Sequence, residues 1–165
     1  MGFPLGIDIS AYQFSSDGKQ KPNFDIINAK CEFVAVRAGI SQYYIDKWFT
    51  YSWQHLTVPR MAYHVIYPEE AADDQMRHFL NIVSPTATDR LVLDVELDHG
   101  QTKTKITETL VRCLEYVREH TGRYPIVYSR ASWINHFVDV SQLPEVDWWL
   151  AHYLKALPYP QFTPE

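Results

Sequence analysis

Two carboxylates stand inside one short apolar run of the sequence, at a spacing suited to acid–base chemistry. Residues 91–97 read LVLDVEL, so Asp94 and Glu96 are two residues apart. Side chains two apart on a strand point to the same face, with α-carbons about 6.6 Å apart. We therefore expect both carboxyl groups to face one pocket. This spacing does not decide between inversion and retention in a glycosidase, because carboxyl positions also depend on side-chain rotamers.

A third acid fits the same arrangement. Residues 6–10 read GIDIS, which places Asp8 on one face of a strand and its apolar neighbours on the other. Three carboxylates that converge on one pocket repel one another and resist desolvation, which favours keeping a proton on one of them. A protonated carboxyl beside an ionised one is the pair that glycoside hydrolysis uses.

We assign the proton of this pair to Glu96 and the negative charge to Asp94. Apolar strand neighbours surround Glu96, and the charge of Asp94 lies on the same face. This assignment predicts a bell-shaped pH dependence with an acidic to near-neutral optimum. The structural alternative is that the acids are held in ion pairs, with Arg37 or Arg60 as partners.

Other site chemistries have little support in the sequence. The seven histidines show no metal-ligand spacing, and no Gly-x-Ser-x-Gly motif is present. No glycine-rich nucleotide loop follows an apolar run, and the cysteines, Cys31 and Cys113, sit in apolar patterns typical of buried thiols. We expect neither a metal nor a cofactor.

Composition and charge narrow the class of protein. The 165 residues predict one domain, and 46% hydrophobic with 21% charged residues is a globular balance. The net charge of −5 argues against nucleic acid as a partner. No stretch approaches the length of a membrane-spanning helix, so we expect no membrane insertion, and we expect a monomer.

The N-terminus and the aromatic content suggest where the protein acts and on what. Residues 1–5 are too short for a signal peptide, so we expect synthesis in the cytoplasm, or secretion with a leader that has been removed. Aromatic residues reach 15%. Exposed aromatic side chains stack on flat ligands such as sugar rings, although a large aromatic core would give the same composition.

The elements that position these acids follow an α/β pattern, in which strand-like runs alternate with stretches of helical periodicity. One helix is expected to begin at Pro68, with Glu69 and Glu70 in its first turn. Its buried side chains would be Met76, Phe79, Leu80 and Val83. Strands are predicted over 5–10, 33–38, 60–67, 91–97, 125–129 and 147–153, and helices over 24–29, 46–55, 102–120 and 131–137.

This alternation predicts a parallel sheet built from βαβ units. Six strands are too few for a closed eight-stranded barrel, so the sheet is either open or a barrel that the chain does not complete.

Six motifs follow one another along nearly the whole chain: GIDIS at 6–10 with Gln13, FVAVRAG at 33–39, AYH at 62–64, LDVE at 93–96, TGRYPIVYS at 121–129 and WWLAHY at 148–153. In this order they resemble glycoside hydrolase family 25, the lysozymes of N-acetylmuramidase type found as phage endolysins and bacterial autolysins.

The resemblance implies an irregular, TIM-like (β/α) barrel that cuts the β-1,4 bond between N-acetylmuramic acid and N-acetylglucosamine in peptidoglycan. It also implies that Glu96 is the general acid, that Asp94 is its partner, and that Asp8 lies on the pocket floor. The attacking group would be the 2-acetamido group of the substrate, oriented by Asp94. Direct attack by an enzyme nucleophile remains the other possibility.

Further residues are expected to bind the glycan. Tyr63 and Tyr128 are candidates for hydrogen bonds to the sugar, and Trp149 and Tyr153 for a stacking wall, with core packing as the alternative for each. Arg37 is a candidate to position an acid or to meet a substrate carboxylate, with a structural ion pair as the alternative.

The carboxyl end departs from the family pattern. Family members continue past WWLAHY with further strands, so we expect residues 1–165 to form one catalytic barrel domain that is incomplete at its C-terminus relative to the family. Two other functions remain open. One is a barrel that binds glycan without cutting it, and the other is a hydrolase of a different N-acetylhexosamine polymer such as chitin.

Overall fold

The sheet of this protein is built from parallel strands that follow one another in chain order. The structure is a computed structural model that describes residues 4–151. Along the path β1-β2-β4-β5-β6-β7 every pair of neighbours is parallel. The short β3 (Tyr44–Ile45) pairs antiparallel with β2. The path consists of β1 (Gly6–Ile9), β2 (Phe33–Ile40), β4 (Arg60–Val65), β5 (Arg90–Asp94), β6 (Ile126–Arg130) and β7 (Trp148–Ala151).

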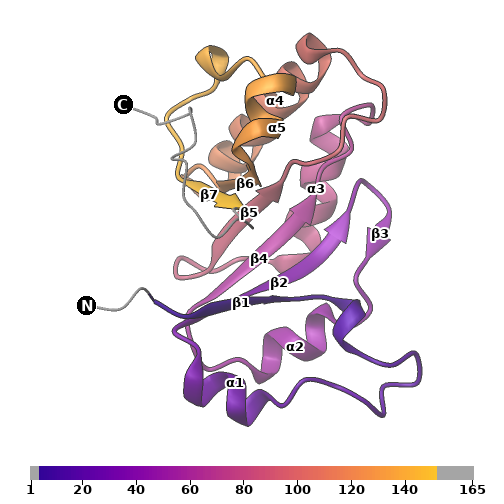
Figure 1. The fold of residues 1–165 in the computed structure, drawn as a ribbon, viewed down its shortest axis with the longest axis vertical. Coiled ribbons are helices and arrows are strands. Elements are labelled where there is room, and N and C mark those ends of the chain that lie inside the picture. The colour runs from indigo at the N-terminus through magenta and orange to yellow at the C-terminus, as the bar shows by residue number, and fades with distance from the viewer. Residues whose placement is uncertain (1–3, 152–165) are drawn as a thin grey trace.

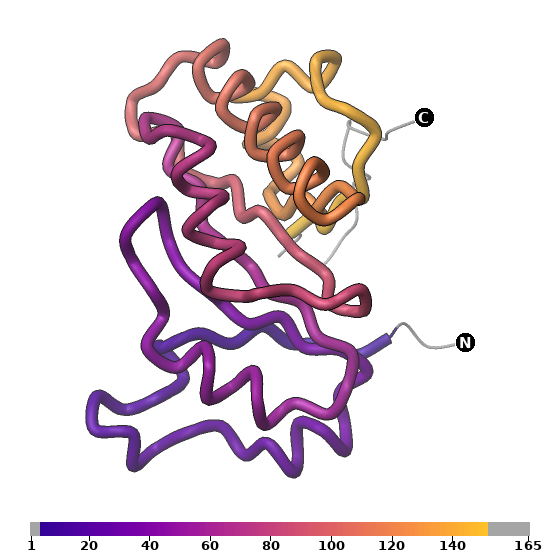
Figure 2. The backbone as a smooth tube through the Cα atoms, turned by 180° about the vertical axis from the view of Figure 1, so that it is seen from behind, coloured from indigo at the N-terminus to yellow at the C-terminus, as the bar shows by residue number. Residues whose placement is uncertain are grey.

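Helices cover the outer face of this sheet. Figure 1 shows α1 and α2 beside β1 and β2, and α4 and α5 at the end of the sheet that holds β6 and β7. Seen from behind, the helices stand in front of the strands (Figure 2). The α/β pattern expected from the sequence is therefore confirmed. The helices are α1 (Phe24–Lys30), α2 (Phe49–His55), α3 (Ala72–Val83), α4 (Lys103–Thr121) and α5 (Ala131–Phe137), with 3-10 turns η1 (Ala11–Gln13) and η2 (Val140–Gln142).

The main core lies between the sheet and the helices. Alternate residues of the strands point to this side, as Val34 and Val36 of β2 and Leu93 of β5 do. Helices α3 and α4 supply the other half of the core with Met76, Phe79, Val83, Ile106, Leu110, Leu114 and Val117. The opposite alternate residues, among them Asp8 and Asp94, face the inside of the curled sheet.

Helix α4 forms where the sequence predicts it because its signals are local. The Thr102 side chain accepts a hydrogen bond from the Lys105 N–H at its start. At its end Gly122 adopts a left-handed conformation with φ of 80°. Glycine adopts this conformation without steric cost, so the helix stops there.

Helix α3 begins later than the sequence predicts. It starts at Ala72 rather than Pro68, so Glu69 and Glu70 lie in the preceding loop. The buried Gln75 side chain explains the difference, since its amide accepts from the Tyr67 N–H and donates to the Tyr67 carbonyl. These bonds hold the loop in a non-helical turn, and Asp73 and Asp74 occupy the first helical turn instead.

Two other boundaries shift because of side-chain contacts over long sequence distances. Strand β5 ends at Asp94 rather than at residue 97. Directly after this end, the Ser129 hydroxyl donates a hydrogen bond to the Val95 carbonyl at 2.6 Å. Helix α2 begins at Phe49 rather than at Asp46. The Asp46 carboxylate instead accepts hydrogen bonds from the Ala11 N–H and from Arg37.

The sheet curls strongly, and over residues 4–151 β1 and β7 each pair with a single neighbour. The Phe33 ring lies over Gly6, where an added Cβ would come within 2.0 Å of the ring. The same ring makes an edge contact with Trp149 of β7, with centroids 6.3 Å apart. A side chain from β2 therefore reaches across to the other end of the sheet, as in a TIM-like barrel that is not closed by backbone pairing.

Among the helices that the structure describes, none combines the length and the hydropathy that a membrane-spanning segment needs.

Candidate active site

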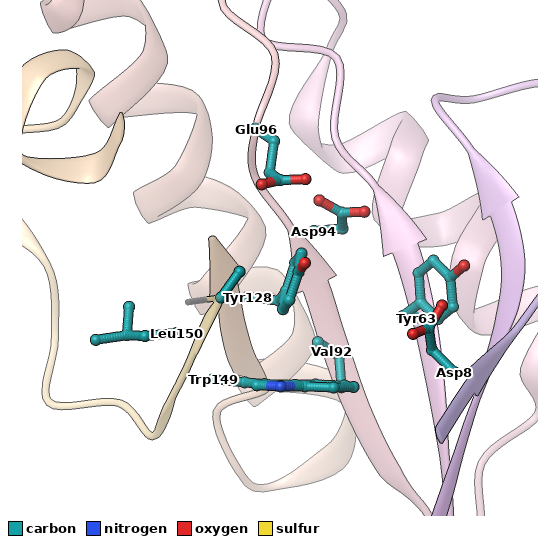
Figure 3. A pocket seen from close by; sticks show the side chains of 9 residues that line it. Asp8, Tyr63, Val92, Asp94, Glu96, Tyr128, Trp149 and Leu150 are labelled. Carbon is teal, nitrogen blue, oxygen red and sulfur yellow. The ribbon is translucent and has the colours of Figure 1, made fainter. Parts of the chain in front are cut away.

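A pocket opens on the inner face of the curled sheet, at the ends of its strands. Its volume is about 460 Å³. Five strands or the residues next to them contribute to it, which is the arrangement of active sites in (β/α) barrels (Figure 3). The lining consists of Asp8, Tyr63, Val92, Asp94, Glu96, Tyr128, Trp149, Leu150 and Ala151.

The three acids picked out by their spacing meet in this pocket. Asp94 is the last residue of β5, and Glu96 follows it beyond the strand end. Figure 3 shows their side chains close together on one wall, with Asp8 of β1 across the pocket beside Tyr63. All three acids therefore line one pocket, as strand alternation predicted, although Glu96 itself lies outside the strand.

Asp94 is the acid whose protonation the fold changes most. Burial, together with the charges of Glu96 and Asp8, raises the pKa of Asp94 to about 7. Its Oδ1 atom is shielded from solvent and has no hydrogen-bond partner among residues 4–151. A buried acceptor without a partner is costly, so this oxygen is available to a donor on a bound molecule.

Glu96 has different surroundings from those expected. Its Oε1 lies 3.3 Å from Nε of Arg130, and its side chain keeps 28% exposure. The apolar strand neighbours do not enclose it, because β5 ends before Glu96 is reached. The expectation assigned the proton of the pair to Glu96, whereas the structure raises the pKa of the more enclosed Asp94.

The ion pairs with Arg37 or Arg60 that were the structural alternative for these acids do not form. Arg37 is buried and donates through Nε to Asp46 Oδ2 at 3.0 Å. Arg60 instead bonds Asp89 at 2.9 Å. Arg37 therefore has the structural ion pair named as its alternative, is not part of the pocket lining, and acts on Asp94 only through its charge, which lowers the pKa of that acid.

Aromatic side chains form much of the remaining wall. The rings of Tyr128 and Trp149 meet at 74°, with centroids 5.2 Å apart. Burial and the charge of Asp8 raise the pKa of Tyr63, so its hydroxyl stays protonated and can donate a hydrogen bond. These three residues line the pocket, and their contacts with a glycan stay a prediction; Tyr153 lies outside the described residues.

Two residues near the pocket were missed from the sequence. Phe33 packs edge-on against the pocket residue Trp149, and nothing local in the sequence signals this contact. Arg130 pairs with Glu96, and it lies two residues after Tyr128, so strand alternation would have found it. In the described part of the chain, no group of three or more His, Cys, Asp or Glu side chains is arranged to hold a metal ion.

Comparison with known families relates most of the chain to a described family. The model of glycosyl hydrolases family 25 matches residues 7–163. The uncharacterized protein YegX of Escherichia coli K12 is 30% identical over 158 residues, which is 93% of this chain and 57% of YegX. The chain thus spans little more than half the length of this curated relative.

Solved structures with the same fold have lower sequence identity. A bacterial lysozyme from Streptomyces coelicolor superposes with a TM-score of 0.80 and 21% identity, covering 96% of this chain and 79% of that one. The modular Cpl-1 endolysin, solved with a peptidoglycan analogue, superposes with a TM-score of 0.70 and 21% identity, covering 88% of this chain and 43% of that one. These likenesses support the (β/α) fold.

Proposed function

The chain belongs to glycosyl hydrolases family 25, and on this basis we propose that it is a peptidoglycan hydrolase that cuts the β-1,4 bond between N-acetylmuramic acid and N-acetylglucosamine. The fold it shares with a lysozyme, and with an endolysin solved with a peptidoglycan analogue, supports this substrate. Peptidoglycan lies in the bacterial cell wall, so the proposal places the site of action there.

The observation that carries this proposal is the unpartnered Oδ1 of Asp94 inside a pocket of acids and aromatic rings. An N-acetylated sugar brings an acetamido N–H into such a pocket, and this group can donate to Oδ1. The bond holds the acetamido oxygen against the anomeric carbon, which is the geometry needed for its attack.

Glu96 supplies the proton in this proposal. The acetamido oxygen attacks the anomeric carbon, the glycosidic bond breaks, and the proton of Glu96 passes to the leaving oxygen. Water then opens the cyclic intermediate and returns a proton to the Glu96 carboxylate. Asp94 stabilises the positive charge that develops on the acetamido group, which requires its ionised form.

One shared proton reconciles these roles with the protonation of the free protein. Asp94 and Glu96 line the same pocket, and the raised pKa of Asp94 keeps a proton there close to neutral pH. An acetamido N–H on Asp94 favours the ionised form of that carboxyl, which leaves the proton to Glu96.

The aromatic wall suits a sugar chain. Trp149 offers a flat indole surface to a pyranose ring, and the Tyr63 hydroxyl can bond a sugar oxygen.

Direct attack by Asp94 is the alternative mechanism. It would leave a covalent glycosyl–protein adduct, which intact mass measurement of a quenched reaction would detect.

Reducing-end release tests the proposal against its two rivals. Purified peptidoglycan and chitin are incubated with the full chain, and both binding and new reducing ends are measured. We expect reducing ends from peptidoglycan only. Binding without new reducing ends would indicate a glycan-binding barrel, and faster release from chitin would indicate a different N-acetylhexosamine polymer as substrate.

A further inference from the structure

Arg130 brings a positive charge to a pocket that is otherwise acidic. It is the last residue of β6, two residues after the pocket residue Tyr128 and therefore on the same face of the sheet. In the sheet register it pairs with Ala151, which also lines the pocket. Its guanidinium therefore lies at the pocket edge, next to Glu96.

The guanidinium of Arg130 is exposed and makes few contacts. Its single ion pair among residues 4–151 joins Nε to Glu96 at 3.3 Å, and 51% of its side chain is exposed. Arg37, by contrast, is buried against Asp46 at 3.0 Å, with 9% of its side chain exposed. A guanidinium has five N–H donors, so Arg130 keeps donors for a bound molecule while it touches Glu96.

The charge of the pocket makes such a cation necessary for an anionic ligand. Asp8, Asp94 and Glu96 repel any carboxylate that enters. Muramic acid carries a lactyl substituent whose carboxylate is free or is extended by a peptide with carboxylates of its own, whereas chitin carries none. A planar guanidinium matches a carboxylate with two parallel hydrogen bonds.

We propose that Arg130 binds the carboxylate of the muramyl substituent and so makes the pocket select carboxylated glycan over neutral N-acetylhexosamine polymers. This inference rests on the proposed function and names the residue that sets its substrate class. Arg130 thus has the role of binding a substrate carboxylate, for which the sequence analysis named Arg37 as a candidate. The guanidinium of Arg37 is instead held by Asp46.

Binding of two forms of one ligand tests this inference. The probe is a soluble N-acetylglucosaminyl–N-acetylmuramyl peptide fragment, and its partner is the same fragment with all carboxyl groups amidated. Titration calorimetry on the full chain measures both dissociation constants for the unmodified protein, Arg130→Met and Arg130→Lys. Arg90→Met is the matched control, since Arg90 begins β5, at the other end of the strand from Asp94, and pairs there with Asp147.

The unmodified protein and Arg90→Met should bind the carboxylated fragment about tenfold more tightly than the amidated one. Arg130→Met should bind the two forms within about twofold, and Arg130→Lys should keep part of the preference. An unmodified protein without a preference, or an Arg130→Met variant that keeps it in full, would overturn the inference. A preference that depends on Arg130 without release of reducing ends would support the inference and reject the proposed hydrolysis.

Discussion

Asp94 ends β5 and Glu96 follows two residues later, and the fold gives their carboxyl groups different surroundings. The more enclosed Asp94 has its pKa raised to about 7, while Glu96 keeps contact with solvent and Arg130. A pair of this kind holds one proton over the range in which a general acid must work.

The alkaline limb of the pH profile should therefore fall near pH 7. Loss of the shared proton removes the general acid, and the pKa of Asp94 of about 7 sets where this loss occurs. Initial rates of reducing-end release between pH 4 and pH 9 test this prediction, with Asp25→Asn on the outer helix α1 as control. A rate that stays constant from pH 6 to pH 9 would contradict it.

Replacing Asp94 by Asn should stabilise the fold at neutral pH and abolish most activity. The folded pKa of about 7 exceeds the ordinary value of 3.8, so the native state loses stability as pH rises from about 4 to 7. Asn carries no charge and avoids this loss. The gain has an upper limit of about 4 kcal/mol above pH 7 and vanishes below pH 4.

Thermal melts of Asp94→Asn and the unmodified protein at pH 4 and pH 8 measure this gain. Asp25→Asn should show no comparable difference between the two pH values. Equal melting temperatures for Asp94→Asn and the unmodified protein at pH 8 would mean that Asp94 is not held in a desolvating, acid-crowded pocket.

At the residue scale, the sequence predicts which acids meet but not how each is solvated. A period of two predicts that Asp94 and Glu96 face one pocket, and both line it although β5 ends at Asp94. Their different solvation depends on Arg130 and on the bond from Ser129 to the Val95 carbonyl. Both contacts join residues 34 positions apart in the chain, which no local pattern reveals.

Among the elements, β4 contains a titratable group that should weaken the fold in acid. His64 is fully buried, and its Nε2 lies 2.7 Å from the Ser41 carbonyl. Burial lowers the pKa of His64 from 6.5 to about 3. The unfolded chain therefore binds a proton below pH 6.5 that the fold does not accept until about pH 3.

Stability should accordingly fall by about 1.4 kcal/mol per pH unit below pH 6.5 from this group. His64→Gln should lack this contribution, so the stability difference between the variant and the unmodified protein should shift in favour of the variant as pH drops from 7 to 4. Urea melts at these pH values measure it, with His136→Gln on α5 as the exposed control. A constant difference between the two proteins would contradict the prediction.

The sequence predicts the boundary of a helix or strand well where the interactions that set this boundary are between residues close in the chain. Helix α4 is predicted to within one residue because Thr102 and Gly122 are its own caps. The start of α3 is missed because Gln75 bonds the loop before it, and β3 is missed because its two residues pair only with β2.

At the scale of the whole molecule, one side chain joins the two ends of the curled sheet across its inner face. The ring of Phe33 lies against Gly6 and reaches Trp149. A Cβ on residue 6 would lie 2.0 Å from this ring, so Gly6→Ala must displace it. We expect a loss of about 1–3 kcal/mol in unfolding free energy.

A double-mutant cycle separates this clash from other effects of the substitution. In a Phe33→Ala background there is no ring to displace, so Gly6→Ala should cost little there. Urea unfolding of the four proteins gives the coupling energy between the two positions. Equal costs in both backgrounds would show that the Phe33 ring does not pack over Gly6.

The central claim is that Glu96 protonates the leaving oxygen of a peptidoglycan bond. The most direct measurement compares reducing-end release from purified peptidoglycan by the unmodified chain, Glu96→Gln and Glu108→Gln, an exposed position on α4 that matches the chemical change. The unmodified chain and Glu108→Gln should be equally active, and Glu96→Gln should lose about 10²–10⁴-fold while it keeps a cooperative thermal melt. Turnover by Glu96→Gln within about tenfold of the unmodified chain would contradict the claim, because an amide has no proton to give.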